Sequence, residues 1–190
     1  MTAVVFDVGE TLVDETRLWE DAAAACGVPR FTLMALVGAT ILRDESQRRA
    51  FEWLGVEVPE RPPFDAELYP DAEACLRRCR GQGLFVAAAG NTPVAAEELL
   101  RPHVDVVGSS ERWGVSKPAA AFFERVAGEV GRAPEEIAYV GDRVDNDVVP
   151  ALAAGMVGVH IRRGPWGHLQ EPPPDAIRIR SLDELPGALP

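Results

Sequence analysis

The sequence has no apolar run long enough for a membrane span and comparatively little positive charge. No stretch of about 18 consecutive apolar residues occurs, and the N-terminus, MTAVVFDVGE, has no basic cluster and reaches an acid at Asp7. We therefore expect neither a transmembrane helix nor a signal peptide. The 19 basic residues are outnumbered by 30 acidic ones, and the net charge of −11 disfavours attraction to nucleic acid. These absences predict a cytoplasmic protein without nucleic-acid or membrane partners.

Cysteine and lysine are also scarce. The three cysteines are an odd, sparse set without a four-ligand zinc pattern, which favours reduced thiols. Cys75 and Cys79 share one face of an expected helix, where packing is the better interpretation. Of the 19 basic residues only Lys117 is a lysine. A lone lysine can mark a place that needs a compact ammonium rather than a planar guanidinium, although on composition alone a general bias toward Arg explains it better.

Hydrophobic residues make up 47% of the chain and charged residues 26%, as is typical of a globular domain. From residue 70 onward, apolar strands alternate with helices at short spacing. Strands are expected at 3–8, 84–90, 104–108, 137–141, 156–163 and 176–179. Helices are expected at 70–80, from Thr92-Pro93, at 118–131, 145–154 and 182–189, with a turn at 164–167. This order predicts an α/β fold, a Rossmann-like parallel sheet with helices on both faces.

The alternation is interrupted by a segment that contains helices alone. Helices are expected at 15–26, 31–43 and 44–54, followed by a proline-rich connection at 57–64. We therefore expect a core domain formed by 1–14 and 70–190, and a small helical insertion at 15–69. This insertion holds 6 Arg against 10 acidic residues, so a solvated helix face is expected for Arg43, Arg48 and Arg49.

Charged residues lie where expected strands end. Asp7 ends the first strand, Asp142 follows the strand at 137–141, and Asp147 lies in the first turn of the next helix. Lys117 comes just before a helix N-terminus. Because ligands bind at the carboxyl ends of parallel strands, we expect these side chains to meet. Two such carboxylates can hold Mg²⁺, and an ammonium nearby can neutralise a phosphate. One Asp alone is better explained as a cap or turn residue, but that explanation is much weaker for all of them together.

Three motifs occur in order along nearly the whole chain. They are FDVGETLVD at 6–14, GVSKPAAAFF at 114–123, and VGDRVDND at 140–147 followed by ALAAGM. In this combination the chain resembles the haloacid dehalogenase (HAD) superfamily of hydrolases. The resemblance implies a Rossmann-like core with a helical cap inserted after the first strand, here the segment 15–69.

The resemblance also implies a catalytic and a metal-binding role for individual residues. Asp7 matches the nucleophile that forms a covalent aspartyl-phosphate, and Lys117 matches the lysine that orders the nucleophile and the phosphoryl group. Mg²⁺ is expected to be held by Asp7, by the backbone carbonyl of Gly9 and by Asp142. Asp147, at the second acidic position of the same motif, completes the expected metal set.

Substrate binding is expected from Thr11, Asn91 and Thr92, but two glycines depart from the family pattern. The phosphatases of this superfamily have Asp-x-Asp-x-Thr in the first motif, and their second Asp is the general acid/base. Here that position is Gly9, and the adjacent Glu10 is a poor substitute because neighbouring side chains on an extended segment point to opposite sides. The usual Ser or Thr before the Asn is Gly90.

The missing general acid at position 9 affects the expected reaction. General acid–base catalysis is worth roughly 10²–10⁴-fold, so Gly9 predicts faster turnover of activated phosphoesters than of alkyl ones. The leading hypothesis is a Mg²⁺-dependent phosphohydrolase that acts on a small phosphorylated metabolite. One alternative is a catalytically weak HAD-like binding protein. Another is a 2-haloacid dehalogenase, which attacks carbon without metal, and the intact VGDRVDND motif argues against it. The sequence determines neither the natural substrate nor the oligomeric state.

Overall fold

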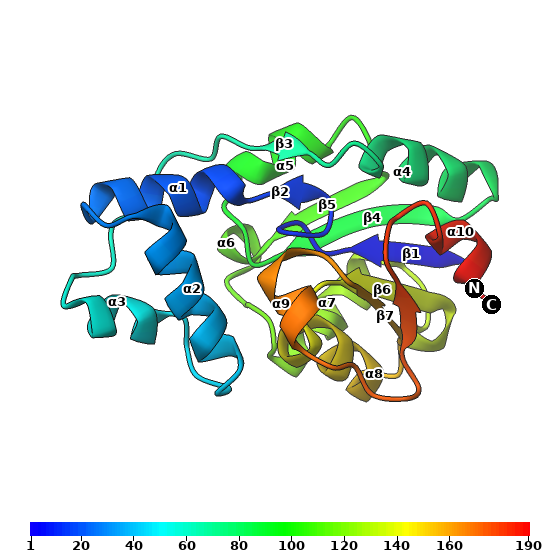
Figure 1. Cartoon of the computed structure of the whole chain (residues 1–190). Helices are drawn as coiled ribbons and strands as arrows, with labels where there is room; N and C mark the ends of the chain where they lie inside the picture. Colours follow the sequence, from blue (N-terminus) through cyan, green and yellow to red (C-terminus); the bar gives the residue numbers. More distant parts are fainter.

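Six strands form one parallel sheet in the computed structural model, which describes residues 1–190 (Figure 1). The strands are β1 (Ala3–Phe6), β4 (Phe85–Gly90), β5 (Val106–Ser109), β6 (Ile137–Gly141), β7 (Val157–Ile161) and β8 (Ile177–Ile179). Their order across the sheet is β5-β4-β1-β6-β7-β8, and every neighbouring pair is parallel. Strand β1 therefore lies between β4 and β6, and the carboxyl ends of these three strands are adjacent.

Both faces of the sheet are buried. Successive residues of each central strand point to opposite sides, and the side chains on both sides pack in a hydrophobic core. Val4 and Phe6 pack on one face, and Ala3 and Val5 on the other. The first face is covered by α4 (Ala72–Gly81), α5 (Ala95–Leu100) and α10 (Leu185–Ala188), and the second by α7 (Ala120–Val130) and α8 (Val149–Ala153). This arrangement confirms the predicted α/β fold and explains why the central strands β1, β4 and β6 carry no charged residue.

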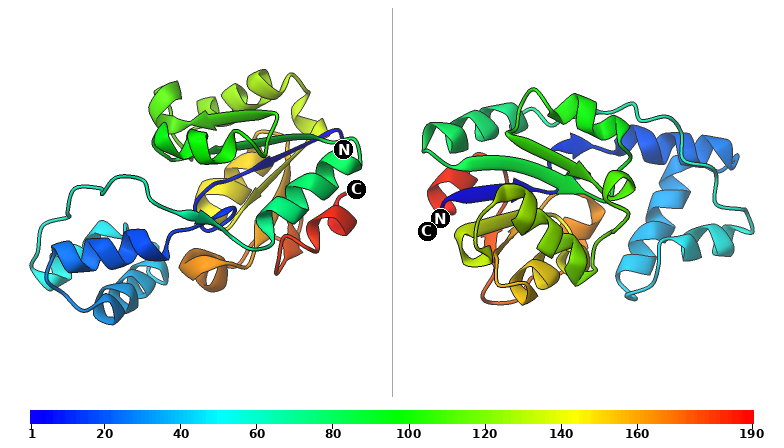
Figure 2. Two further views of the ribbon diagram at one scale, coloured as in Figure 1. Left: turned by 90° about the horizontal axis from the view of Figure 1, so that it is seen from above. Right: turned by 180° about the vertical axis from the view of Figure 1, so that it is seen from behind.

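Three helices lie together beyond the carboxyl ends of the strands, whereas the two termini lie close together at the other end of the sheet (Figures 1 and 2). They are α1 (Thr16–Ala25), α2 (Arg30–Ile41) and α3 (Arg48–Leu54), and we call them the helical unit. Leu33, Val37 and Phe51 are buried in its own small core. No single helix is long and apolar enough to cross a membrane; α1 and α2 pass that test only as a pair, by length and composition, with a bend of 111° between them.

Some elements differ from the sequence predictions. The chain enters and leaves the helical unit through an antiparallel pair, β2 (Val13–Asp14) and β3 (Glu67–Leu68), in which each strand is too short to show periodicity. A short helix, α6 (Ser110–Trp113), was also not predicted, and a 3-10 turn, η1 (Pro134–Glu136), precedes β6. The helix expected at 145–154 begins as a π-helical turn, η2 (Val144–Val148), before α8.

The turn expected at 164–167 is in fact a helix, α9 (Gly164–Leu169). Gly164 has a φ of +61°, and Pro165 follows at the start of the helix, where a proline costs no hydrogen bond. The buried Trp166 then packs against the core of the helical unit. This contact between distant segments stabilises the helix, and nothing local in the sequence indicates it.

Candidate active site

Three aspartates come together where β1 and β6 end. Phe6 pairs with Val140 in the sheet, and the backbone N–H of Asp7 donates to the carbonyl of Val140 over 2.7 Å. Asp7 and Asp142 therefore follow neighbouring strands at the same level. Together with Asp147 of η2 they each offer a carboxylate oxygen within 4.8 Å of the others, and all three residues are buried. The expected convergence of these side chains is present.

The single lysine joins two of these carboxylates. The Nζ atom of Lys117 lies 2.5 Å from Oδ1 of Asp7 and 2.5 Å from Oδ1 of Asp147. The same Nζ atom lies 5.7 Å from the centre of the Tyr139 ring. Burial alone would lower the pKa of Lys117, but the carboxylates of Asp147 and Asp7 outweigh it and raise that pKa. The ammonium therefore stays charged in this buried position.

Asn91 holds the backbone of this lysine. Its Oδ1 accepts from the N–H of Lys117 over 2.8 Å, and its Nδ2 donates to the carbonyl of the same residue over 3.0 Å. The amide oxygen and one N–H of Asn91 are therefore engaged inside the protein. This geometry makes the side chain of Asn91 a positioning group for Lys117. Asn91 also lines the cavity, and its contact with substrate stays a prediction.

Asp147 is fully buried, and it does not line the cavity that lies between the strand ends and the helical unit. Besides accepting from Lys117, its other oxygen accepts from the N–H of Arg143 over 3.0 Å. Its carboxylate lies where any side chain at Gly141 would be, so only glycine fits there. Burial and the nearby Asp7 raise the pKa of Asp147 to about 6, although Lys117 opposes this. Both oxygens of Asp147 are therefore engaged within the protein, one of them by the ammonium of Lys117.

Asp142 has a different environment from the other two aspartates. Its Oδ2 atom is buried and has no hydrogen-bond partner, whereas its backbone carbonyl accepts from Nε2 of His160 over 3.1 Å. Burial raises the pKa of Asp142, and the carboxylates of Asp147 and Asp7 raise it further. A buried carboxylate without a partner is costly, and a bound cation relieves that cost. The oxygen donors of Asp7 and Asp142 therefore fit a hard divalent cation.

The two threonines predicted to bind substrate lie in different places. Thr92 lines the cavity, and its buried hydroxyl has no partner. Thr11 is fully buried and does not line the cavity, so the geometry does not support its predicted contact with substrate. A Cβ atom added to Gly90 would lie 2.6 Å from Oδ1 of Asp7, so the nucleophile candidate itself fills the place of a side chain there. The hydroxyl of Thr92 is then the free donor on this side.

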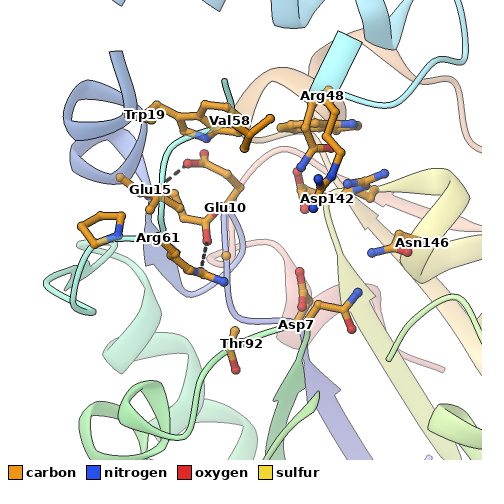
Figure 3. Close-up of a pocket in the computed structure, with 18 of the residues that line it drawn as sticks. Asp7, Glu10, Glu15, Trp19, Arg48, Val58, Arg61, Thr92, Asp142 and Asn146 are labelled. Carbon is orange, nitrogen blue, oxygen red and sulfur yellow. Dashed lines mark hydrogen bonds and ion pairs between the residues drawn. The ribbon is translucent and has the colours of Figure 1, made fainter. Parts of the chain in front are cut away.

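A cavity of about 370 Å³ separates these residues from the helical unit (Figure 3). The core contributes Asp7, Thr92, Lys117 and Asp142 to its lining. The helical unit and the connection after it contribute Leu18, Trp19, Arg48, Phe51, Val58 and Arg61. The helical unit thus faces the carboxyl ends of the strands, and the volume is typical of a site for a small molecule.

Among the arginines of the helical unit that were expected on a solvated face, only Arg48 lines the cavity. The guanidinium of Arg43 lies over the ring of Trp53, 5.0 Å from its centre, and Arg49 pairs with Glu52. Arg48 has no ion-pair partner in the protein and is available to an anionic group in the cavity.

Two glutamates lie in the same cavity. The carboxylate of Glu10 accepts from the hydroxyl of Tyr69 over 2.7 Å and from the N–H of Glu15 over 3.0 Å. Glu15 has Arg61 Nη2 3.7 Å from its Oε1 (Figure 3). Burial, together with the smaller effects of Glu10 and Asp7, raises the pKa of Glu15 to about 7 against the opposing effect of Arg61. Sequence analysis did not find Glu15, because no spacing or motif marks it.

Comparison with known proteins places the chain among hydrolases. A family profile described as haloacid dehalogenase-like hydrolase matches residues 1–155. Two relatives are named glyceraldehyde 3-phosphate phosphatase. The one from Methanocaldococcus jannaschii is 36% identical, over 62% of this chain and 54% of that protein. The one from Methanopyrus kandleri is 29% identical, over 95% of this chain and 92% of that protein. A phosphoserine phosphatase from Thermus thermophilus is 36% identical, over 75% of this chain and 63% of that protein.

Solved structures share the fold over nearly the whole length. A HAD phosphatase from Thermococcus onnurineus superposes with a TM-score of 0.65 and 24% identity, covering 97% of this chain and 96% of that one. A dehalogenase superposes with a TM-score of 0.73 and 21% identity, covering 100% and 97%. At these identities the likeness describes the fold, and it does not distinguish between the two activities.

Proposed function

This chain belongs to the haloacid dehalogenase-like hydrolases, and from that premise we propose that it is a Mg²⁺-dependent phosphatase of small phosphorylated metabolites. The observation that carries the proposal is the meeting of Asp7, Lys117 and Asp142 at one end of a cavity of small-molecule size. Relatives named as phosphatases support the substrate class.

Asp7 is the nucleophile in this proposal. Lys117 holds its Oδ1, so Oδ2 attacks the phosphorus atom while the bond from phosphorus to the leaving oxygen breaks. This step forms an aspartyl-phosphate, and attack by water then releases phosphate and restores the carboxylate. The Lys117 ammonium neutralises part of the charge that phosphoryl transfer spreads over the phosphoryl oxygens, and the Thr92 hydroxyl donates to one of them.

Asp7, Asp142 and the backbone carbonyl of Gly9 would hold the Mg²⁺ ion. The unpartnered, buried Oδ2 of Asp142 supports this assignment. When bound, the ion supplies positive charge to the phosphoryl oxygens. Asp147, which the sequence analysis counted among the metal ligands, acts here through Lys117, because both of its oxygens already accept hydrogen bonds.

We further propose that residues 15–69 act as a cap on a core formed by 1–14 and 70–190. Support comes from the cavity, which is lined by the helical unit on one side and by the strand ends on the other. A cap in this position excludes water from the aspartyl-phosphate before the substrate alcohol has left.

The test is the hydrolysis of 4-nitrophenyl phosphate with and without added Mg²⁺. We expect metal-dependent turnover by the wild type, none above background by Asp7→Asn, and wild-type rates for Asp21→Asn, an equivalent change at an exposed position on α1. Turnover that survives Asp7→Asn would remove the nucleophile from this scheme. Tight phosphate binding without turnover by the wild type would favour a binding protein instead.

A further inference from the structure

The place of the missing side chain at Gly9 is occupied by another carboxylate. A Cβ atom built on Gly9 would lie 2.6 Å from both Cδ and Oε1 of Glu15, and 2.9 Å from Oε2. Its three nearest neighbours are thus all atoms of one carboxylate. Any side chain at position 9 would extend into the volume that the Glu15 carboxylate now fills.

The backbone between these two residues turns back on itself. The N–H groups of Leu12 and Val13 both donate to the carbonyl of Val8, over 3.0 Å and 2.9 Å. Glu10 adopts a φ of +51° within this turn, in the left-handed region that few side chains enter. As a result Glu15, at the N-terminal boundary of α1, returns to the level of Gly9.

Glu15 is held in this place by contacts at both its backbone and its side chain. Its N–H donates to Glu10, which in turn accepts from Tyr69 of the segment that follows β3. Arg61 lies 3.7 Å from its carboxylate, and the side chain is 23% exposed. Glu15 lines the cavity together with Asp7. Glu15 is thus placed by the turn after β1, by Arg61 of the connection that follows the helical unit, and by the start of α1.

We propose that Glu15 is the general acid/base of this enzyme and replaces the carboxylate that Gly9 lacks. The assignment rests on the phosphatase function proposed above. It also changes the expectation drawn from Gly9, because the structure provides a carboxylate at the place where the sequence shows none. Glu10 does not take this role, since its two oxygens accept hydrogen bonds from Glu15 and Tyr69.

The proton balance follows from the two steps of the reaction. In the first step Oδ2 of Asp7 forms a bond to phosphorus, and the electron pair of the breaking bond stays on the leaving oxygen. The protonated Glu15 gives its proton to that oxygen, so the product alcohol leaves neutral. In the second step the Glu15 carboxylate takes a proton from water while the water oxygen bonds to phosphorus. The bond to Asp7 breaks, phosphate leaves, and Glu15 is protonated again.

The experiment compares an alkyl with an aryl phosphate, because only the alkoxide of the first needs a proton as it leaves. We would measure kcat/KM for glycerol phosphate and for 4-nitrophenyl phosphate with wild type, Glu15→Gln and Glu20→Gln. Glu15→Gln should lose roughly 10²–10⁴-fold on glycerol phosphate and much less on the aryl ester. Glu20→Gln, the same change further along α1 at a residue that pairs with Arg30, should match the wild type.

A second variant guards against a folding defect in the first. The double variant Gly9→Asp/Glu15→Ala has room for the new side chain, because the atoms nearest to it belong to the removed Glu15 side chain. It should recover most of the glycerol phosphate activity that Glu15→Ala lacks. If the wild type is active and Glu15→Gln leaves the alkyl-to-aryl ratio of kcat/KM unchanged, the assignment of Glu15 is overturned and the proposed function stands. A wild type inactive on both esters would overturn the proposed function together with it.

Discussion

Replacement of Lys117 tests the charge arrangement at the centre of the site. The ammonium forms two buried ion pairs, each with an N–O distance of 2.5 Å, and its side chain is 2% exposed. Removing one partner of a buried pair costs about 3–5 kcal/mol, because it leaves uncompensated charge in the interior. At about 2–4 °C per kcal/mol for a domain of this size, Lys117→Met should lower Tm by about 6–20 °C.

The conservative variant separates charge from geometry. Lys117→Arg keeps the positive charge, but a planar guanidinium needs more room than this buried point between Asp7 and Asp147 provides. Its kcat/KM should fall by at least about 10²-fold, the effect of losing one positioned electrostatic group. Arg17→Ala is the control, since it removes an exposed pair with Asp65 and should cost less than about 1 kcal/mol. Wild-type activity in Lys117→Arg would show that the site needs only a positive charge at this position and no compact ammonium.

Two further predictions concern the metal and the substrate. Calorimetric titration should show at least about tenfold weaker Mg²⁺ binding for Asp142→Asn than for wild type, because the variant loses a charged ligand; equal affinity would exclude Asp142 from the metal site. Arg48 lines the cavity without an ion-pair partner, so it is available to a second anionic group of a substrate. Arg48→Ala should therefore raise KM for phosphoserine, which has such a group, by about 5–10-fold. It should leave KM for 4-nitrophenyl phosphate, which has none, nearly unchanged. Equal effects of Arg48→Ala on both substrates would remove Arg48 from substrate recognition.

The sheet was predictable because burial on both faces leaves a strong local signal. Strands such as β4 are apolar at every position, and glycines such as Gly131 mark helix ends. The β2–β3 pair and α9 left no such signal. The first has two residues in each strand, and the second depends on Trp166 packing against a helical unit more than 100 positions away in the chain.

The site was predictable where backbone topology determines it. Asp7 and Asp142 had to meet, because neighbouring parallel strands bring their carboxyl ends together. The partners of individual side chains were not predictable. The sequence cannot tell that Asn91 uses its amide on the backbone of Lys117, or that Asp147 uses both oxygens inside the protein.

Glu15 shows a limit of motif comparison. A motif assigns roles by position along the chain, and position 9 holds a glycine. The turn after β1 brings a carboxylate from six positions later into the same space. Only the path of the backbone reveals this substitution, since Glu15 lies outside every motif.

The proposed mechanism requires that Asp7 accepts the phosphoryl group. The most direct measurement mixes the wild type with Mg²⁺ and 4-nitrophenyl phosphate, quenches with acid during turnover and locates phosphate in the digested protein by mass spectrometry. Phosphate is expected on the peptide that contains Asp7, and none in Asp7→Asn treated in the same way. Steady turnover with an unmodified Asp7 peptide, or with phosphate on another residue, would contradict the proposed mechanism.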